Sequence, residues 1–217
     1  MLKETLWAGG LSRVDTILHI ADIHIRNLKR HDEYRSVFEK LYDICKSKVK
    51  ENKNTIIYLA GDIVHAKTDM TPELIDLVTE FLDTLSRIAP TILIMGNHDC
   101  NLNNMSRMDA LSPIVSMIDS DFNELFYLKQ SGVYSLENVD FVLNSVYENP
   151  KNFILANDIK GDRTKIVLYH GPVDRASTDT GVLMKHNDVK IEMFDGFDYG
   201  LFGDIHKFQY LDVDCKF

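Results

Sequence analysis

Short β-rich apolar runs alternate with longer amphipathic segments in the first half of the chain. The short runs cover residues 16–22, 55–62 and 91–95, and the longer segments cover residues 31–50 and 71–90. Apolar residues in the longer segments recur at the spacing of a helix buried on one face. Thr71 supplies an N-cap, Pro72 a first helical residue, and Pro90 ends the segment. Strands and helices that alternate at these intervals predict βαβ units and a largely parallel sheet.

After about residue 120 the apolar runs become shorter and lie closer together. They cover residues 124–128, 132–136, 139–147, 165–171 and 198–213. We expect these runs to form a second sheet. Residues 171–196 carry few periodic apolar positions, which predicts a long loop with at most one turn of helix. Long loops inside compact domains are often functional.

Composition indicates one ordinary α/β domain. The chain has 217 residues, of which 45% are hydrophobic and 26% charged, and no apolar run approaches the roughly 18 residues of a membrane span. Charged residues interrupt the N-terminal apolar positions, so a secretory signal is not expected. The three cysteines are odd in number and widely spaced, which argues against a disulfide framework or a thiolate zinc site. We therefore expect an intracellular protein with no membrane partner, in the cytoplasm, or in the nucleus or a viral factory if the source is eukaryotic or viral.

The net charge of −9 has the wrong sign for holding nucleic acid by bulk electrostatics. Between residues 26 and 53, nine basic residues stand against five acidic ones. This local excess has two interpretations, a solvated helix face or a phosphate-binding patch, and the solvated face is favoured.

Chemically active side chains follow five of the apolar runs. They are Asp22 and His24, Asp62 and His65, Asn97 with His98 and Asp99, His170, and Asp204 with His206. Alone, the Gly-Asn-His-Asp run is also typical of an ordinary turn. Functional groups gather beyond the carboxyl ends of parallel strands, and alternate residues of a strand share one face, so each D-x-H pair could hold one ion. Carboxylate, imidazole and amide oxygen suit Mn²⁺, Fe²⁺, Zn²⁺ or Mg²⁺, and indicate a catalytic rather than a structural metal site.

The order of these motifs resembles the calcineurin-like metallophosphoesterase superfamily, whose pattern is D-x-H, G-D-x-x-H, G-N-H-[DE], a lone H and G-H-x-H. The match runs from Asp22 to His206. The chain is most similar to the DNA-repair nuclease branch, bacterial SbcD and its relatives, including those of phages and large viruses, in the stretches "DIHIRNLKRHDEY", "GDIVHAKT", "YHGPV" and "GDIHKFQ". The resemblance implies a four-layer α/β/β/α sandwich with two mixed β-sheets.

The resemblance also implies two metal ions that share a bridging hydroxide. One ion would bind Asp22, His24, Asp62 and His206, and the other would bind Asp62, Asn97, His170 and Asp204, with Asp62 as the bridge. His98, held by Asp99, would face the scissile phosphate, and Gly96 would permit the tight turn before them. His65 would help to position the phosphate or would pack against the site. His19 is interpreted as a strand-packing residue, and His31 and His186 as surface residues.

Asp204 departs from the family pattern, which has histidine at this position. With Asp22 and Asp62 it makes three carboxylates, so two divalent ions and one hydroxide would leave a formal charge of zero where the family pattern leaves one positive charge. Either Asp204 is a ligand, and its harder oxygen favours Mn²⁺ or Mg²⁺ over zinc, or it points away and the second ion binds weakly.

The leading functional expectation is a Mn²⁺-dependent DNA phosphodiesterase, an exo- and endonuclease subunit of a DNA repair or recombination complex. By resemblance its partners would be DNA, an SMC-like ATPase subunit and a second copy of the chain. The alternatives are a phosphatase or small-molecule phosphodiesterase on the same metal core, and a catalytically weak protein-interaction scaffold. We expect residues 1–217 to form one domain that lacks the C-terminal strands and DNA-capping region of the nuclease relatives.

Overall fold

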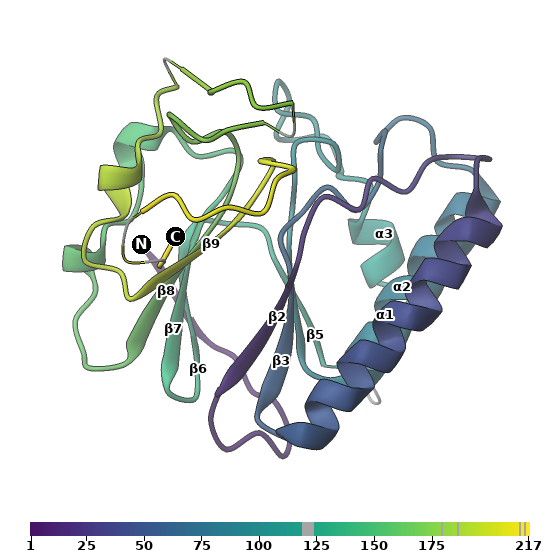
Figure 1. The fold of residues 1–217 in the computed structure, drawn as a ribbon, viewed down its shortest axis with the longest axis horizontal. Coiled ribbons are helices and arrows are strands. Elements are labelled where there is room, and N and C mark those ends of the chain that lie inside the picture. The colour runs from purple at the N-terminus through teal and green to yellow at the C-terminus, as the bar shows by residue number, and fades with distance from the viewer. Residues whose placement is uncertain (119–123, 179, 186, 213, 215) are drawn as a thin grey trace.

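The computed structural model describes residues 1–118, 124–178, 180–185, 187–212, 214 and 216–217, which form two face-to-face β-sheets (Figure 1). One sheet has the strand order β2 (Thr16–Ile20), β3 (Thr55–Leu59), β4 (Thr91–Ile94) and β5 (Leu125–Leu128). The other has the order β1 (Leu2–Thr5), β6 (Gly132–Leu136), β7 (Val139–Asn144), β8 (Thr164–His170) and β9 (Tyr199–Gly203). The helices are α1 (His31–Glu51), α2 (Pro72–Ile88) and α3 (Ser112–Val115). Three 3-10 turns follow, η1 (Pro150–Asn152), η2 (Ala156–Asp158) and η3 (Ile191–Phe194).

Strand β3 shows how the sheet between the helices and the second sheet is built. Adjacent residues of a strand point to opposite faces. Ile57 and Leu59 therefore join the core beneath α1 and α2, whereas Ile56 and Tyr58 join the core between the two sheets. All five residues of β3 are fully buried, so this strand reads as a continuous apolar run.

A third core covers the outer face of the mixed sheet. Val142 and Tyr169 of this sheet contribute to it, together with Phe194 of η3 and Phe153 beside η1. In Figure 1 the α-helices lie on one side of the two sheets and the short turns on the other. The expected four-layer sandwich is thus confirmed, with 3-10 turns and loops as its fourth layer.

The structure corrects the expectation of two mixed sheets. Within the described residues, the helix-side sheet is wholly parallel, and only the β6–β7 pair of the other sheet is antiparallel. Strand β5 belongs to the parallel sheet, although it was expected in the second one. Strand β1 was not predicted, because its sequence Leu2–Thr5 has one apolar residue, two adjacent charged residues and a threonine, and so lacks an alternating pattern. Of the described residues in the run 198–213, only Tyr199–Gly203 form a strand.

Helix α2 begins and ends as predicted. The Thr71 hydroxyl accepts a hydrogen bond from Leu74 N, and Pro72 is the first helical residue. The described residues of the expected loop at 171–196 contain one helical turn, η3. No helix of the described residues is both long and apolar enough to cross a membrane.

The basic residues of α1 are largely engaged with acidic neighbours. Arg35 pairs with Asp76 and Glu80 of α2 at 3.2 Å, and Lys48 pairs with Glu51 at 2.8 Å. These pairs favour the interpretation of a solvated helix face. Cys45 and Cys100 are free and buried, and Cys215 lies outside the described residues.

Candidate metal centre

The predicted ligands lie just beyond the carboxyl ends of the strands, in left-handed backbone rather than in the strands themselves. Strand β2 ends at Ile20, and Asp22 and His24 follow with φ of 55° and 49°. Strand β9 ends at Gly203, and Asp204 and His206 follow with φ of 76° and 56°. Strand alternation was expected from the sequence to bring the two side chains of each D-x-H motif to one face. The structure corrects this, because both motifs lie after the strands end. Both motifs adopt the same pattern of two left-handed residues, a costly arrangement that is concentrated at functional sites.

Two glycines allow the strand ends to approach one another. A Cβ atom on Gly96 would clash with the backbone nitrogen and carboxylate of Asp62. A Cβ atom on Gly61 would lie 2.6 Å from Gly96 N and 2.8 Å from His170 Nδ1. The expected tight turn follows Gly96, whose carbonyl oxygen accepts a hydrogen bond from Asp99 N at 3.2 Å. Gly96 does not have a positive φ, so glycine is needed here for the close approach to Asp62.

The first group of ligands joins the ends of β2, β3 and β9. The Nε2 atoms of His24 and His206 lie 3.1 Å apart, and His24 Nε2 lies 3.5 Å from Asp62 Oδ2. Ligand atoms of Asp22, His24 and His206 lie within 4.8 Å of one another. Asp204 N donates to Asp22 Oδ1 at 2.9 Å, which ties the two D-x-H motifs together. The structure thus assembles the four residues expected around one ion.

The second group joins the ends of β3, β4, β8 and β9. His170 Nε2 lies 3.4 Å from Asp62 Oδ2, 3.0 Å from Asn97 Oδ1 and 4.0 Å from Asp204 Oδ1. His170 Nδ1 donates to Ala60 O at 2.6 Å, which leaves Nε2 directed at the group. The Asp204 carboxylate faces His170 instead of pointing away. These are the four residues expected around the other ion, and Asp62 belongs to both groups.

The surroundings of Asn97 test whether a cation fits this group. Its Oδ1 lies 3.0 Å from His170 Nε2 and 3.0 Å and 3.2 Å from the two Asp62 oxygens. An oxygen facing only acceptors is unfavourable unless a cation or a donor proton lies among them. The alternative is a rotated amide whose nitrogen donates to the same atoms. Imidazole, carboxylate and amide groups converging in this way form a donor set that fits a divalent ion.

Burial makes the charges of this centre interdependent. Burial alone would raise the pKa of Asp62, but the hydrogen bond and charge of His170 lower it below its usual value. Burial alone would lower the pKa of His170, yet Asp62 raises it to about 9. Burial raises the pKa of both Asp22 and Asp204, and burial lowers the pKa of His24 to about 4. Three neighbouring carboxylates held this far from water need positive charge, which divalent ions would supply.

Comparison with known proteins agrees with this geometry. Residues 15–208 match the calcineurin-like phosphoesterase family. The chain belongs to this family. It is also 47% identical over 210 residues to R555, an uncharacterized protein of Acanthamoeba polyphaga mimivirus. The aligned part is 93% of this chain but 15% of that protein, so the chain spans a small fraction of the length of this relative.

Membership implies metal-dependent hydrolysis of phosphate esters, and the two ligand groups are where this phosphoesterase would hold its ions. The relative comes from a large virus, in keeping with the viral members expected among the similar proteins. The structure brings together all the residues predicted as ligands.

His98 borders the centre but is held differently from the sequence expectation. Its backbone nitrogen donates to Asp62 Oδ1 at 2.8 Å, and its Nδ1 donates to His65 O at 2.6 Å. Its ring centroid lies 4.7 Å from that of His24. The Nδ1 bond leaves Nε2 as the free ring nitrogen. The expectation that Asp99 holds His98 is therefore wrong, because a backbone carbonyl takes that place.

Asp99 instead braces the backbone of the site. It is fully buried, and its oxygens accept hydrogen bonds from Gly96 N at 2.9 Å and Val64 N at 3.1 Å. Burial raises the pKa of Asp99 to about 7, despite these two donors. The contact joins the loop after β4 to the loop after β3, so Asp99 acts on Asp62 through the backbone.

His65 stacks on His98, with ring centroids 5.6 Å apart, and ligand atoms of His24, His65 and His98 lie within 4.8 Å of one another. His19 lies exposed on β2 with its ring 5.2 Å from that of Tyr58, so strand packing describes it only in part. His31 is half-buried and contacts Arg26 O at 2.9 Å, and His186 lies outside the described residues.

Two supporting residues were missed from the sequence. Lys67 Nζ donates to Asn97 O at 2.9 Å and fixes the loop that carries this ligand. The Tyr34 hydroxyl donates to His24 O at 2.9 Å from the first turn of α1. Lys67 stands two positions after His65, and this proximity was the only signal for it in the sequence.

Proposed function

We propose that this phosphoesterase hydrolyses phosphodiester bonds of DNA and serves as the nuclease subunit of a repair or recombination complex. The observation that carries the proposal is the pair of ligand groups that share Asp62, with His98 beside them. The stretches similar to the SbcD-like nucleases support DNA as the substrate over a small phosphate ester.

The residues of the site have two roles: the ligand groups bind ions, and His98 transfers a proton. A pair of divalent ions, when bound, supplies a nucleophilic hydroxide and offsets charge on the phosphate oxygens. Asp62 holds the two ligand groups next to each other, because its carboxylate belongs to both. His98 donates a proton from Nε2 to the leaving oxygen.

Cleavage of a phosphodiester requires the proton that His98 would donate. The leaving group is a sugar alkoxide, a strong base that requires a proton as the bond to phosphorus breaks. His98 Nδ1 is occupied by His65 O, so the ring can present Nε2 in only one orientation. His98 belongs to neither of the two ligand groups, so we propose it as the general acid and not as a further metal ligand.

We propose Mn²⁺ as the natural ion. Asp22, Asp62 and Asp204 provide three carboxylates, and the only nitrogen donors among the proposed ligands are the imidazoles of His24, His170 and His206. Hard oxygen donors favour Mn²⁺ or Mg²⁺ over Zn²⁺. The scaffold alternative is disfavoured, because burying these acids without ions would be costly.

The test compares four substrates with the Mn²⁺-loaded protein. We expect cleavage of single-stranded or duplex DNA, with slower hydrolysis of bis-p-nitrophenyl phosphate and little of p-nitrophenyl phosphate. Asp62→Ala is the matched inactive control. Rapid hydrolysis of p-nitrophenyl phosphate without DNA cleavage would replace the proposal with a phosphatase, and inactivity on all four with a scaffold.

We also propose an SMC-like ATPase subunit and a second copy of the chain as protein partners. The support is again the similarity to SbcD-like nucleases. Sedimentation of the chain alone, and with an SMC-like ATPase subunit, tests both. Sedimentation of the chain as a monomer would reject the second copy, and no shift on adding the ATPase would reject that partner.

A further inference from the structure

A cleft leads from the metal centre toward the open edges of β2 and β9. A pocket of about 410 Å³ is lined by Asp22 and His206 of the first ligand group and by His19 and Phe208. A larger pocket of about 630 Å³ continues from it. The two share His19, Phe202, Ile205, Lys207 and Phe208. A ligand that contacts these shared residues would therefore lie next to the first ligand group.

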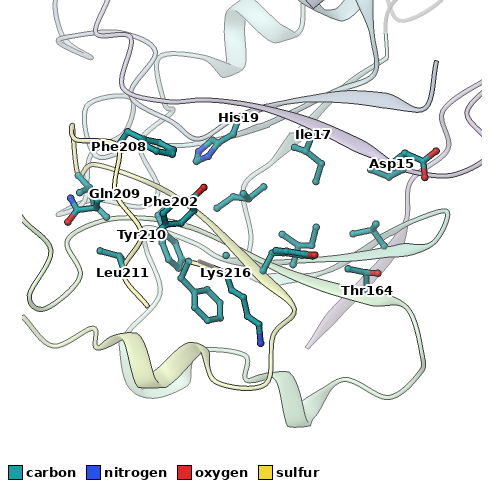
Figure 2. Close-up of a pocket in the computed structure, with 18 of the residues that line it drawn as sticks. Asp15, Ile17, His19, Thr164, Phe202, Phe208, Gln209, Tyr210, Leu211 and Lys216 are labelled. Atoms are coloured by element: carbon teal, nitrogen blue, oxygen red, sulfur yellow. The ribbon is translucent and has the colours of Figure 1, made fainter. Parts of the chain in front are cut away.

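Two aromatic side chains stand on the loop after His206. Phe208 is 87% exposed and Tyr210 57% exposed, and their rings contact edge to face with centroids 5.5 Å apart. In Figure 2, Phe208 and His19 lie at the same end of the larger pocket, far from Thr164 and Asp15. An exposed phenylalanine beside a catalytic centre suits a flat apolar partner.

The flanking residues fix the position of Phe208. Lys207 Nζ donates to Ser177 Oγ at 3.1 Å, and Gln209 Oε1 accepts from Ser177 N at 3.0 Å. Gln209 Nε2 donates back to Ser177 O at 2.8 Å. The loop that contains Ser177 thus holds the residues on either side of Phe208 and leaves its ring exposed.

The charges along the wall suit a nucleotide strand. Lys207 has no carboxylate partner among the residues that the structure describes, so its charge is available to a phosphate. The net charge of −9 gives little general attraction for a polyanion, so local contacts must supply affinity. Stacking of a base on an aromatic ring contributes roughly 1–3 kcal/mol and does not depend on net charge.

We propose that Phe208, with His19 and Tyr210, forms a subsite that stacks an unpaired nucleobase next to the scissile phosphate. The inference rests on the proposed function and extends it, because a base can stack here only from a single strand or a frayed end. Lys207 contacts the adjoining phosphate.

The experiment uses two dodecamers with the same phosphodiester backbone, oligo-dT and an oligomer of tetrahydrofuran abasic units. Wild-type protein loaded with Mn²⁺ is expected to cleave oligo-dT with a KM roughly tenfold lower, a factor that corresponds to about 1.4 kcal/mol. Phe208→Ala and Phe208→Leu should raise the KM for oligo-dT to that of the abasic oligomer while kcat changes little. Phe208→Tyr should keep the preference. Trp7→Ala is the matched control, because Trp7 is 77% exposed and lines neither pocket.

A second measurement separates the subsite from the nuclease activity. A phosphorothioate dodecamer carrying 2-aminopurine is titrated into wild-type and Phe208→Ala protein, and stacking is followed as loss of fluorescence. Cleavage of both dodecamers with equal KM by wild type and Phe208→Ala would overturn the subsite and leave the nuclease proposal standing. If wild type cleaves neither, the nuclease proposal fails, and the titration decides the subsite. If 2-aminopurine fluorescence is quenched by wild type but not by Phe208→Ala, the subsite is supported. If both proteins quench the fluorescence equally, the subsite is overturned.

Discussion

The Nε2 atoms of His24 and His206, 182 residues apart in the chain, lie 3.1 Å apart. Each terminates a D-x-H motif that follows an edge strand, one in each sheet. Two imidazole nitrogens at this separation can share one ion at metal–nitrogen distances of about 2.0–2.1 Å. The contact between His24 and His206 therefore joins the two sheets, and it also brings together two members of the first ligand group.

Removing Asp62 should abolish binding of both ions, because its carboxylate belongs to both ligand groups. Removing the His98 ring should leave the ions bound, because His98 borders the groups without belonging to them. We expect Asp62→Ala to lose both equivalents of Mn²⁺. His98→Ala should retain them and lose roughly 10²–10⁴-fold in kcat.

Metal content by mass spectrometry and single-turnover kinetics measure these two effects separately. Circular dichroism confirms that each variant is folded. Equal loss of metal from Asp62→Ala and His98→Ala would reject the division of roles between the two residues.

Replacing Gly96 should weaken metal binding without touching a ligand. The new methyl group of Gly96→Ala would occupy space held by the Asp62 carboxylate. Overpacking of this kind typically costs about 1–3 kcal/mol, and here we expect it to displace Asp62. Mn²⁺ affinity, measured by calorimetry, should fall at least roughly tenfold.

Gly181→Ala is the control for the Gly96 substitution. Gly181 has φ of 84° and nothing within 4 Å of an added Cβ atom, so its replacement strains the backbone without a clash. Wild-type affinity in Gly96→Ala, or an equal loss in both variants, would show that the close approach to Asp62 is unimportant.

The carboxylate of Asp204 should set the metal preference. Asp204→His replaces a hard oxygen by an imidazole at the 4.0 Å approach to His170, and removes one negative charge from the centre. We expect Zn²⁺ affinity to rise relative to Mn²⁺, and phosphate to inhibit more strongly. Competition titrations with the two ions and inhibition by inorganic phosphate measure this. An unchanged ratio of Zn²⁺ to Mn²⁺ affinity in Asp204→His would contradict the proposed role.

Much of the fold, and the convergence of the candidate ligands, could be predicted because local signals agreed with tertiary structure. Helix α2 has its cap, its proline and its apolar stripe in one stretch, and β3 is buried on both faces. The ligands could be placed because parallel strands align their carboxyl ends, a rule that does not depend on side-chain detail.

The failures concern features that are decided by distant parts of the chain. Strand β5 resembles the short strands after it, and only its pairing with β4 assigns it to the parallel sheet. The partner of His98 is a backbone carbonyl from another loop, and Asp99 faces backbone nitrogens. The left-handed φ of Asp22 and His24 could not be inferred, because aspartate and histidine also occur in ordinary strands.

Anomalous scattering from crystals grown with Mn²⁺ tests the central claim most directly. We predict two peaks flanking the Asp62 carboxylate. One should lie among Asp22, His24 and His206, and the other among Asn97, His170 and Asp204. A single peak, or peaks away from Asp62, would contradict a centre built from two ligand groups with a shared carboxylate.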